Sequence, residues 1–341
     1  MKSRIAQTLL GIIIASIFLY LAFRDANISL LWSSLSSVNY LIISLLIPIT
    51  IISHWVRALR WKYLLEPVKS IRGTRTLFSA VMIGYLINNF VPRLGEIARS
   101  YSVSKLEGVS KSAAFGSVVI ERIIDLVTYA FMLSTVLFFY PRALDPFISN
   151  GESAGPFLFI WSLALLALLI LFFLFSRALF GRLKMLLPLI PEKLRHHVER
   201  VIASFLSGMG FVSSRERFGL IIFHSMLIWF LYAVGVYVPF FAFPDLLPLQ
   251  LDFGAAVVLL TVSSFSFLLP SPGAFGTYHT FVSVALIQIF LADQATALSY
   301  AIVTHSAGLL ITVAVGLYAL FRSHLHVKEI TSAETGTTGE R

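Results

Sequence analysis

The chain has 341 residues, of which 57% are hydrophobic and only 13% are charged, about half the charged share of an ordinary soluble protein. A soluble core could not bury so much apolar surface, so we expect an integral membrane protein with several membrane-embedded segments. The sequence contains no cysteine, which excludes disulfides, thiolate metal sites and cysteine nucleophiles, and its eight histidines form no paired metal motif.

The net charge of +9 comes from Lys and Arg residues that lie between apolar runs. This placement is typical of loops that face anionic lipid headgroups. No aromatic and basic recognition motif is present, so we expect no nucleic-acid partner. The chain also lacks a P-loop, and we expect no bound cofactor and no metal site.

The first apolar run covers 5–23 and follows Lys2 and Arg4. It is too long for the apolar region of a signal peptide, and no small-residue cleavage site follows it, so we expect an uncleaved first span. A helix needs roughly 20 apolar residues to cross the hydrocarbon core. Five further runs are long enough or nearly so: 40–56, 113–140, 156–176, 218–243 and 297–321.

Three other apolar runs, at 77–91, 254–269 and 280–291, are short, and each lies beside a Pro/Gly break. Lys and Arg gather on cytoplasmic loops of membrane proteins. By that rule the N-terminus, the basic segments and the C-terminal tail are cytoplasmic, whereas three loops poor in Lys and Arg lie outside. The basic segments are 57–75 and 176–217, and the outer loops are 24–39, 141–155 and 244–253.

A full crossing by 77–91 would place 92–112 outside, although that segment holds Arg93, Arg99, Lys105 and Lys111. A hairpin over about 77–104 that enters from the cytoplasm and returns removes this conflict, and the same argument predicts a hairpin over 254–291 from the outside. We therefore predict an all-α polytopic membrane protein with about six full transmembrane helices and two re-entrant helical hairpins. They form a single domain over 1–325, followed by a disordered cytoplasmic tail at 326–341.

The two predicted hairpins resemble each other at their turns. Both contain Pro-x-x-Gly, as Pro92 and Gly95 in the first and Pro270 and Gly273 in the second. They enter from opposite faces, which is the pattern of an inverted repeat, and inverted repeats with broken helices are typical of transporters. Pro and Gly are also common turn formers, so the motif on its own is a weak signal.

The first candidate site lies at the first turn. Pro92 suits the first turn of a helix, and the free N–H groups of a half-helix beside Arg93 would form an anion site for which phosphate is the natural ligand. A spacing of three residues places Arg93, Glu96 and Arg99 along one face. The candidate residues are Asn88, Asn89, Pro92, Arg93, Gly95, Glu96 and Arg99.

The second candidate site is Glu121, Arg122 and Asp125, which lie inside the apolar run at 113–140. Glu121 and Asp125 share a helix face, and Arg122 and Asp125 can pair. A charged residue inside a span costs roughly 2.5–3.5 kcal/mol, so these groups must pair, reach water or contact a polar ligand. A self-neutralising structural network, with Arg93, Arg99 and Arg122 balancing the acids at 96, 121 and 125, is the alternative to substrate contact.

The third candidate site is the second turn, which supplies hydroxyl groups and small residues but no fixed charge. Gly273 and Gly276 allow the backbone to approach a ligand closely. Pro272 could open a half-helix that faces the first hairpin, and we interpret His279 and His305 as hydrogen-bonding structural residues and His54 as interfacial. The candidates are Ser266, Pro270, Ser271, Pro272, Gly273, Gly276, Thr277, Tyr278 and His279.

Three motifs in this order and spacing resemble the lysylphosphatidylglycerol synthase transmembrane-region family of flippase-like membrane proteins, over roughly 5–322. They are Asn88-Asn-Phe-Val-Pro-Arg-Leu-Gly-Glu-Ile-Ala-Arg99, Glu121-Arg-Ile-Ile-Asp125 and Leu269-Pro-Ser-Pro-Gly-Ala-Phe-Gly276. The best-known members fuse this region to a cytoplasmic domain that transfers an aminoacyl group to phosphatidylglycerol. We expect no such domain here, so the synthase activity is not carried over.

The resemblance implies a role in moving a lipid between leaflets. Members often have a second Gly after the late Pro-Gly and an acidic residue shortly beyond, where this chain has Ala274 and His279. The second hairpin is therefore not expected to handle the same headgroup, particularly a cationic one.

Together, these observations predict a lipid flippase-like transporter of the cytoplasmic membrane, not an enzyme, with both termini in the cytoplasm. Its expected partners are membrane lipids, either an anionic phospholipid or a lipid-linked phosphate. A membrane transferase acting on lipid-linked substrates, using a carboxylate as general base, is one alternative. A non-catalytic partner of a separate lipid-synthesis enzyme, with a basic surface segment at 191–217, is the other.

Overall fold

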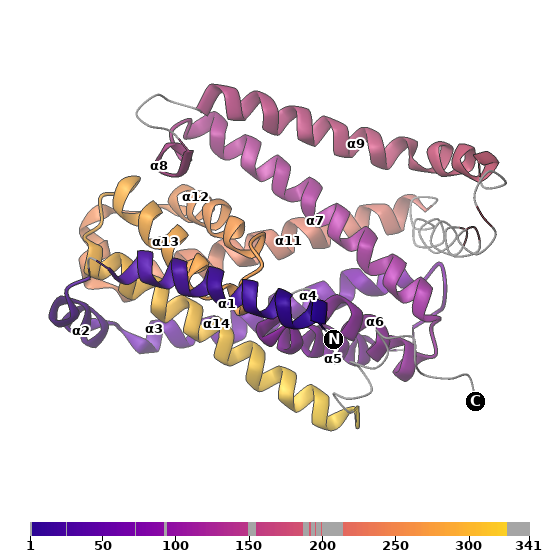
Figure 1. The fold of residues 1–341 in the computed structure, drawn as a ribbon, viewed down its shortest axis with the longest axis horizontal. Coiled ribbons are helices and arrows are strands. Elements are labelled where there is room, and N and C mark those ends of the chain that lie inside the picture. The colour runs from indigo at the N-terminus through magenta and orange to yellow at the C-terminus, as the bar shows by residue number, and fades with distance from the viewer. Residues whose placement is uncertain are drawn as a thin grey trace.

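The structure is a computed structural model that describes residues 2–24, 26–71, 73–91, 94–148, 155–186 and 214–325, together with positions 191, 195 and 199. Every regular element in these ranges is helical, and no strand occurs among them. The predicted all-α polytopic class is therefore confirmed. Most of the long helices run along the long axis of the molecule (Figure 1).

The chain begins with α1 (Lys2–Phe23), α2 (Ile28–Ser37) and α3 (Tyr40–Ser44). A first series of four helices follows: α4 (Leu46–Leu65), α5 (Thr74–Phe90), α6 (Leu94–Glu107) and α7 (Lys111–Phe139). Next come α8 (Asp145–Ile148) and α9 (Gly155–Leu186). A second series contains α11 (Arg215–Tyr237), α12 (Phe253–Ser264), α13 (Thr277–Gln288) and α14 (Gln294–Arg322), with short 3-10 turns η3 (Val238–Ala242), η4 (Pro244–Leu249), η5 (Phe265–Phe267) and η6 (Pro272–Ala274).

Local sequence sets where several helices begin. The Ser110 hydroxyl accepts a hydrogen bond from the backbone N–H of Ala113 at the start of α7, and Asp293 accepts one from Thr296 at the start of α14. These side chains satisfy donors that a helix leaves open in its first turn. The two long helices that carry much of the bundle are therefore fixed at their first residues.

Four of the six predicted spans form helices long and apolar enough to cross a membrane: Tyr40–Leu65, Lys111–Phe139, Arg215–Ala242 and Gln294–Arg322. The run predicted at 5–23 forms α1, which is bent by 90° against α2. The run predicted at 156–176 forms part of α9, which is apolar over Gly155–Leu171. Large apolar side chains such as Leu310 and Phe138 are exposed on this bundle, as a lipid environment requires.

The predicted outer loops gather at one end of the bundle. Helix α2, which the sequence reading missed inside the loop 24–39, and α8 in the loop 141–155 both lie toward the left-hand end (Figure 1). In the third loop, Asp245 accepts a hydrogen bond from Thr296 at the start of α14, which packs on α2. The three loops therefore share an end, as the charge pattern predicts. The tail at 326–341 and most of 187–213 lie outside the described residues.

The two series of four helices repeat the same packing. Helices α5 and α6 form a hairpin between α4 and α7, and α12 and α13 form a hairpin between α11 and α14. Helix α4 packs against its counterpart α11, α5 packs against α14, and α12 packs against α7. Exchanging the two series leaves this set of contacts unchanged, which supports the predicted repeat.

The tips of the two hairpins meet inside the bundle. A Cβ atom on Gly273 in the second tip would lie 3.2 Å from the carbonyl oxygen of Asn89 in the first. Gly273 also has a φ of 54°, which a glycine adopts at little cost. The backbones can approach closely here because this position has no side chain.

Single cysteines provide a test of the re-entrant hairpin, because the chain contains none of its own. We expect Gly73→Cys, directly before α5, and Lys105→Cys, in the last turn of α6, to react with a membrane-impermeant maleimide from the cytoplasmic face only. Ser36→Cys in α2 should react from the outside only. If the labels at 73 and 105 appear on opposite faces, the first hairpin is a full crossing.

Close packing of α14 on α5 provides a second test. A Cβ atom on Gly316 would lie 2.7 Å from the Cβ of Leu86, whereas a Cβ on Gly308 in the same helix meets nothing within 4 Å. We expect Gly316→Ala to destabilise the protein by about 1–3 kcal/mol through overpacking. Gly308→Ala should be neutral or slightly stabilising. Thermal unfolding in detergent measures both, and equal midpoints would contradict the close approach.

Candidate functional site

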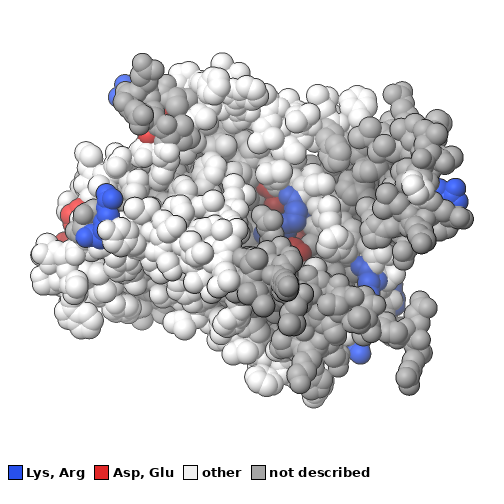
Figure 2. All heavy atoms as spheres, viewed as in Figure 1, with Lys and Arg blue, Asp and Glu red and all other residues white. Residues whose placement is uncertain are grey.

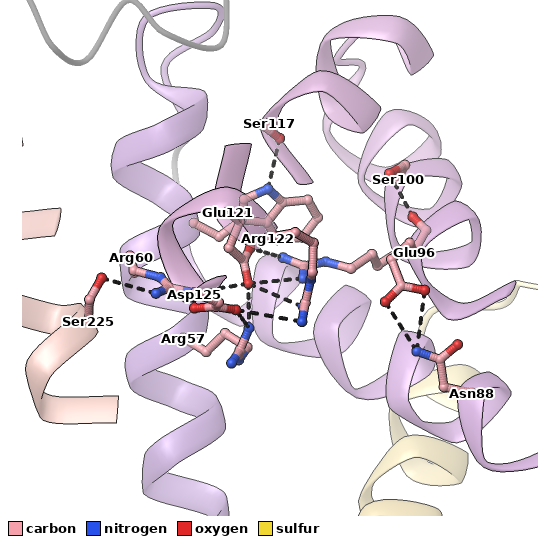
Figure 3. Close-up of polar contacts among 12 residues, drawn as sticks. Arg57, Arg60, Asn88, Glu96, Ser100, Ser117, Glu121, Arg122, Asp125 and Ser225 are labelled. Carbon is pink, nitrogen blue, oxygen red and sulfur yellow. Dashed lines mark hydrogen bonds and ion pairs between the residues drawn. The ribbon is translucent and has the colours of Figure 1, made fainter. Parts of the chain in front are cut away.

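A buried carboxylate on α7 forms the centre of the site. The Glu121 side chain is completely buried, and its carboxylate contacts guanidinium groups that come from α4, α6 and α7 itself (Figure 3). Glu121 lies ten residues after the start of α7, so it is about 15 Å along a helix of 29 residues. The charged groups are therefore located well inside the bundle.

Two of these arginines lie on α4, where the sequence reading expected a cytoplasmic loop. Arg57 donates to Glu121 Oε1 over 2.6 Å and to Asp125 Oδ2 over 3.0 Å. Arg60 lies one helical turn further on, and its Nη2 is 3.2 Å from Glu121 Oε1 and 2.7 Å from Asp125 Oδ1. Both side chains are almost fully buried, so assigning Arg57 and Arg60 to a loop was wrong.

Helix α11 completes the surroundings of the α4 arginines. Arg57 Nη2 donates to the hydroxyl of Tyr232 over 3.0 Å, and Arg60 Nη1 donates to the hydroxyl of Ser225 over 3.0 Å. A guanidinium has five N–H donors in a fixed fork, and these contacts use several of them. The pair of helices at the centre of the repeat is thus joined through polar groups.

The third arginine comes from the first hairpin. Both terminal nitrogens of Arg99 on α6 donate to the Glu121 carboxylate, in a two-pronged arrangement typical of strong Arg–carboxylate pairs. The Arg99 guanidinium lies 4.0 Å from the centre of the Trp61 ring, which is a cation–π contact. The indole N–H of Trp61 in turn donates to Ser117 over 2.9 Å.

Arg122 differs from the other three arginines. Its side chain is 43% exposed, and its nitrogens lie 3.5 Å from Glu121 and 3.5 Å from Asp125. The predicted pairing of Arg122 with Asp125 is therefore present, but it is loose. Arg122 can turn toward a ligand without breaking a short ion pair.

We call Arg57, Arg60, Arg99 and Arg122 with Glu121 and Asp125 the arginine cluster. Four positive and two negative charges give it a net charge of +2. The Nε atoms of Arg57, Arg60 and Arg99 are buried and make no hydrogen bond within the described part of the chain. The expected self-neutralising balance omitted Arg57 and Arg60. When Glu96, which lines the hollow beside the cluster, is counted with the six residues, four positive and three negative charges leave an excess of +1.

A small hollow opens beside the cluster, with a cavity volume of about 40 Å³. Acidic and basic atoms are visible in a hollow near the centre of the face in Figure 2, and the other charged atoms on this face lie toward its ends and edges. The hollow is thus on the side of the bundle, not at its end. Its lining residues are Val81, Gly84, Tyr85, Asn88, Gly95, Glu96, Arg99 and Arg122.

The turn of the first hairpin forms one wall of the hollow. The Asn88 side-chain oxygen accepts the N–H of Gly95 over 2.7 Å, and its amide nitrogen lies 3.4 Å from both oxygens of Glu96. A Cβ atom on Gly95 would collide with the carbonyl oxygen of Gly84, so only glycine allows this turn. Glu96 and Arg99 of the first candidate site both line the hollow, whereas Pro92 and Arg93 lie outside the described residues.

The second turn does not join the arginine cluster. It contacts the first hairpin near Asn89, whose side chain donates to Thr312 on α14. Within the turn, the hydroxyls of Ser271 and Thr277 lie 2.9 Å apart, and Thr277 also donates to the carbonyl of Ser266. The turn therefore has internal partners for its hydroxyl groups.

Helix α1 packs against the second turn at several of the candidate positions. A Cβ atom on Gly11 would lie 2.7 Å from the carbonyl oxygen of Pro270 and 3.2 Å from Pro272, and one on Gly276 would collide with the backbone of α1. Pro270, Pro272 and Gly276 thus serve a packing role in this arrangement.

The histidines divide into two groups. His305 lies 2.8 Å from the carbonyl oxygen of Gly273, which agrees with the hydrogen-bonding role expected for it. His54 is 5% exposed and its ring lies 4.4 Å from that of Tyr85, so the interfacial interpretation was wrong. Within the described residues, no group of three His, Asp or Glu side chains could hold a metal ion.

These features define a polytopic all-α membrane protein with a cationic site inside its helix bundle. The chain belongs to the family described as the lysylphosphatidylglycerol synthase TM region, whose family model matches residues 8–316. The resemblance inferred from the three motifs is therefore confirmed. Membership places the chain among membrane proteins of lipid metabolism or transport.

Two curated relatives are both described as UPF0104 membrane proteins. That of Methanocaldococcus jannaschii is 27% identical over 145 residues, which are 41% of this chain and 43% of the relative. That of Methanothermobacter thermautotrophicus is 26% identical over 214 residues, which are 54% of this chain and 58% of the relative. The matches thus span about half the length of these relatives. No solved structure matches the chain significantly.

The central role of Glu121 is testable by an isosteric change. Glu121→Gln removes the negative charge that three buried guanidiniums share, and breaking such a pair costs about 3–5 kcal/mol. We expect a large drop in the thermal unfolding midpoint. Glu216→Gln makes the same change at an exposed position in α11 and should shift stability by less than about 0.5 kcal/mol. Equal midpoints for the two variants would contradict the central role.

Proposed function

We propose that this protein is a flippase-like transporter that moves a phospholipid or a lipid-linked headgroup between bilayer leaflets, and that the arginine cluster binds the headgroup phosphate. The observation that carries the proposal is the excess of positive charge. Three arginines that are at most 4% exposed meet two carboxylates, and Arg122 adds a fourth positive charge at the hollow. An uncompensated charge inside a protein is costly, and an anionic ligand would offset it.

The location of the hollow supports a lipid ligand over a soluble anion. It opens on the side of the bundle, and the described atoms directly around it in Figure 2 belong to uncharged residues. A phosphate bound there could stay attached to acyl chains that remain in the membrane. A site for a soluble anion would need a route from the water at either end of the bundle.

The chemistry of Arg122 fits the part of the site that contacts the ligand. A guanidinium binds phosphate oxygens through parallel N–H donors, which gives both energy and orientation. Arg99 is held by Glu121 and lies at the back of the same hollow. Glu96 is on the other wall and, among the described residues, pairs with no arginine, so its carboxylate is available to a hydroxyl or amine of the headgroup.

The meeting of the hairpin tips supports a transport role over a purely structural one. Two broken helices that touch inside a repeat form the kind of site that alternating access uses in other transporters. The first tip borders the hollow through Asn88, and the next residue, Asn89, touches the second tip. Movement of one hairpin would therefore change the access to the hollow.

The proposal includes the cytoplasmic membrane as location, with both termini in the cytoplasm, and membrane lipids as partners. A separate lipid-synthesis enzyme would supply or consume the transported lipid. The proposal assigns no enzymatic step to the chain. The sequence contains no nucleotide-binding motif, and the proposed lipid movement is therefore either down the lipid's own gradient or coupled to the movement of an ion.

Leaflet exchange in liposomes tests the proposal. Purified protein should accelerate the loss of fluorescence when dithionite quenches lipids that carry a label on the acyl or prenyl tail and reach the outer leaflet. Phosphatidylglycerol, phosphatidylethanolamine and a polyprenyl phosphate cover the headgroup classes. We expect Arg122→Gln to slow exchange by about 10–100-fold, the equivalent of losing a charge-assisted hydrogen bond.

Arg142→Gln is the matched control, since Arg142 is exposed near the opposite end of α7. It should exchange lipid at the wild-type rate. If wild type matches empty liposomes for every lipid, the transport proposal is overturned. If wild type is active and Arg122→Gln equals it, the phosphate role of Arg122 is overturned.

A further inference from the structure

Two buried histidines lie side by side behind the tip of the second hairpin. His279 on α13 and His305 on α14 have ring centres 4.9 Å apart, in an edge-to-face arrangement. Their residues are 5% and 9% exposed. The Nδ1 atom of His279 is buried and has no hydrogen-bond partner among the described residues. A buried polar atom without a partner is uncommon in proteins and calls for an explanation.

His305 holds the tip of the second hairpin. A carbonyl oxygen can only accept, so the His305 Nε2 that lies 2.8 Å from Gly273 O carries the proton and donates it. Gly273 is the residue that touches Asn89 of the first tip. His305 is thus joined by a single hydrogen bond to Gly273, the residue at which the second hairpin contacts the first.

The pair is surrounded by groups without fixed charge. The ring of Tyr278 on α13 lies 5.2 Å from that of His305, and its hydroxyl bonds to Thr304 on α14. Phe275 of the turn stacks on His279 and meets His305 edge to face. Two other elements face this region. Phe18 of α1 stacks on Phe281 of α13, and the backbone of Asn89, at the end of α5, lies against Gly273 of the turn. Among the described residues, the titratable side chains that lie against His279 are His305, with ring centres 4.9 Å apart, and Tyr278, with ring centres 6.3 Å apart.

Because the pair is buried in this conformation, a movement of the second hairpin tip that exposed it to water would change its proton affinity. In this packing a proton on His279 would meet no acidic side chain among the described residues, so burial favours the neutral form of both rings. Protonation of either ring becomes favourable when the tip moves and water enters. By thermodynamic linkage, proton binding must then favour the conformation in which the second hairpin tip has moved over the conformation in which it contacts the first hairpin.

We propose that His279 and His305 form a proton-binding site that couples lipid movement to a proton gradient. The inference rests on the proposed transport function and supplies its ion coupling. Proton binding to the pair releases the Gly273 tip from the first hairpin, and loss of the proton restores the closed contact. One proton moves on and off an imidazole nitrogen in this cycle, and no covalent bond between heavy atoms changes.

The test uses the lipid-exchange liposomes with a pH difference imposed across the membrane and a pH-sensitive dye inside. We expect one direction of the gradient to speed wild-type exchange by at least about fivefold, the lower end of typical coupling factors. Dye fluorescence should report proton movement that requires the transported lipid. His305→Gln retains a donor for Gly273 O but cannot bind the proton, and it should exchange lipid without responding to the gradient.

His279→Gln should likewise lose the response to the gradient. Because the hydrogen bond to Gly273 O comes from His305, this variant tests proton binding separately from that bond. The matched control is His224→Gln, another buried histidine, which bonds to Leu220 O on its own helix and should keep the response. Gradient-independent exchange in wild type overturns the coupling and leaves the transport function intact. A retained response in both His279→Gln and His305→Gln overturns the assignment to this pair. Absence of exchange in wild type overturns both proposals.

Discussion

The Glu121 carboxylate organises this structure. It is completely buried, and guanidinium groups from α4, α6 and α7 converge on its two oxygens. Each of those arginines would be too costly to bury alone in a membrane-embedded bundle. One glutamate therefore allows α4, the first hairpin and α7 to bring charge into the interior. The remaining features of the site, including the excess of positive charge and the loosely held Arg122, follow from this arrangement.

The two halves of the chain use different means to stabilise equivalent hairpins. The first hairpin is tied by ion pairs through Arg99 and by the Asn88 bond to Gly95. The second has hydroxyl groups, a histidine bond to Gly273 and close packing on α1. A repeat with one charged half and one neutral half places its ligand chemistry at the first hairpin and leaves the second free for another task.

Much of the fold could be predicted from local sequence. Hydrophobic runs located the long helices, and the Pro/Gly breaks with the charge pattern located both hairpins. Glu121, Arg122 and Asp125 could be found because their spacing of one helical turn fell inside an apolar run. Arg57 and Arg60 were missed because the positive-inside rule counts basic residues and takes no account of partners 60 residues away. One signal could have found them: Arg57 and Arg60 are three residues apart, so they share a helix face beside Trp61 if the helix continues past the apolar run.

The different hold on Arg99 and Arg122 has a kinetic consequence. Rotation of a half-exposed side chain takes picoseconds to nanoseconds, whereas movement of packed helices takes microseconds or longer. An anion that enters the hollow can be captured by Arg122 while Arg99 stays on the Trp61 ring and the backbone stays still. Ligand binding would then equilibrate many times before each slow step of the hairpins, and the concentration for half-maximal rate would approximate a true dissociation constant.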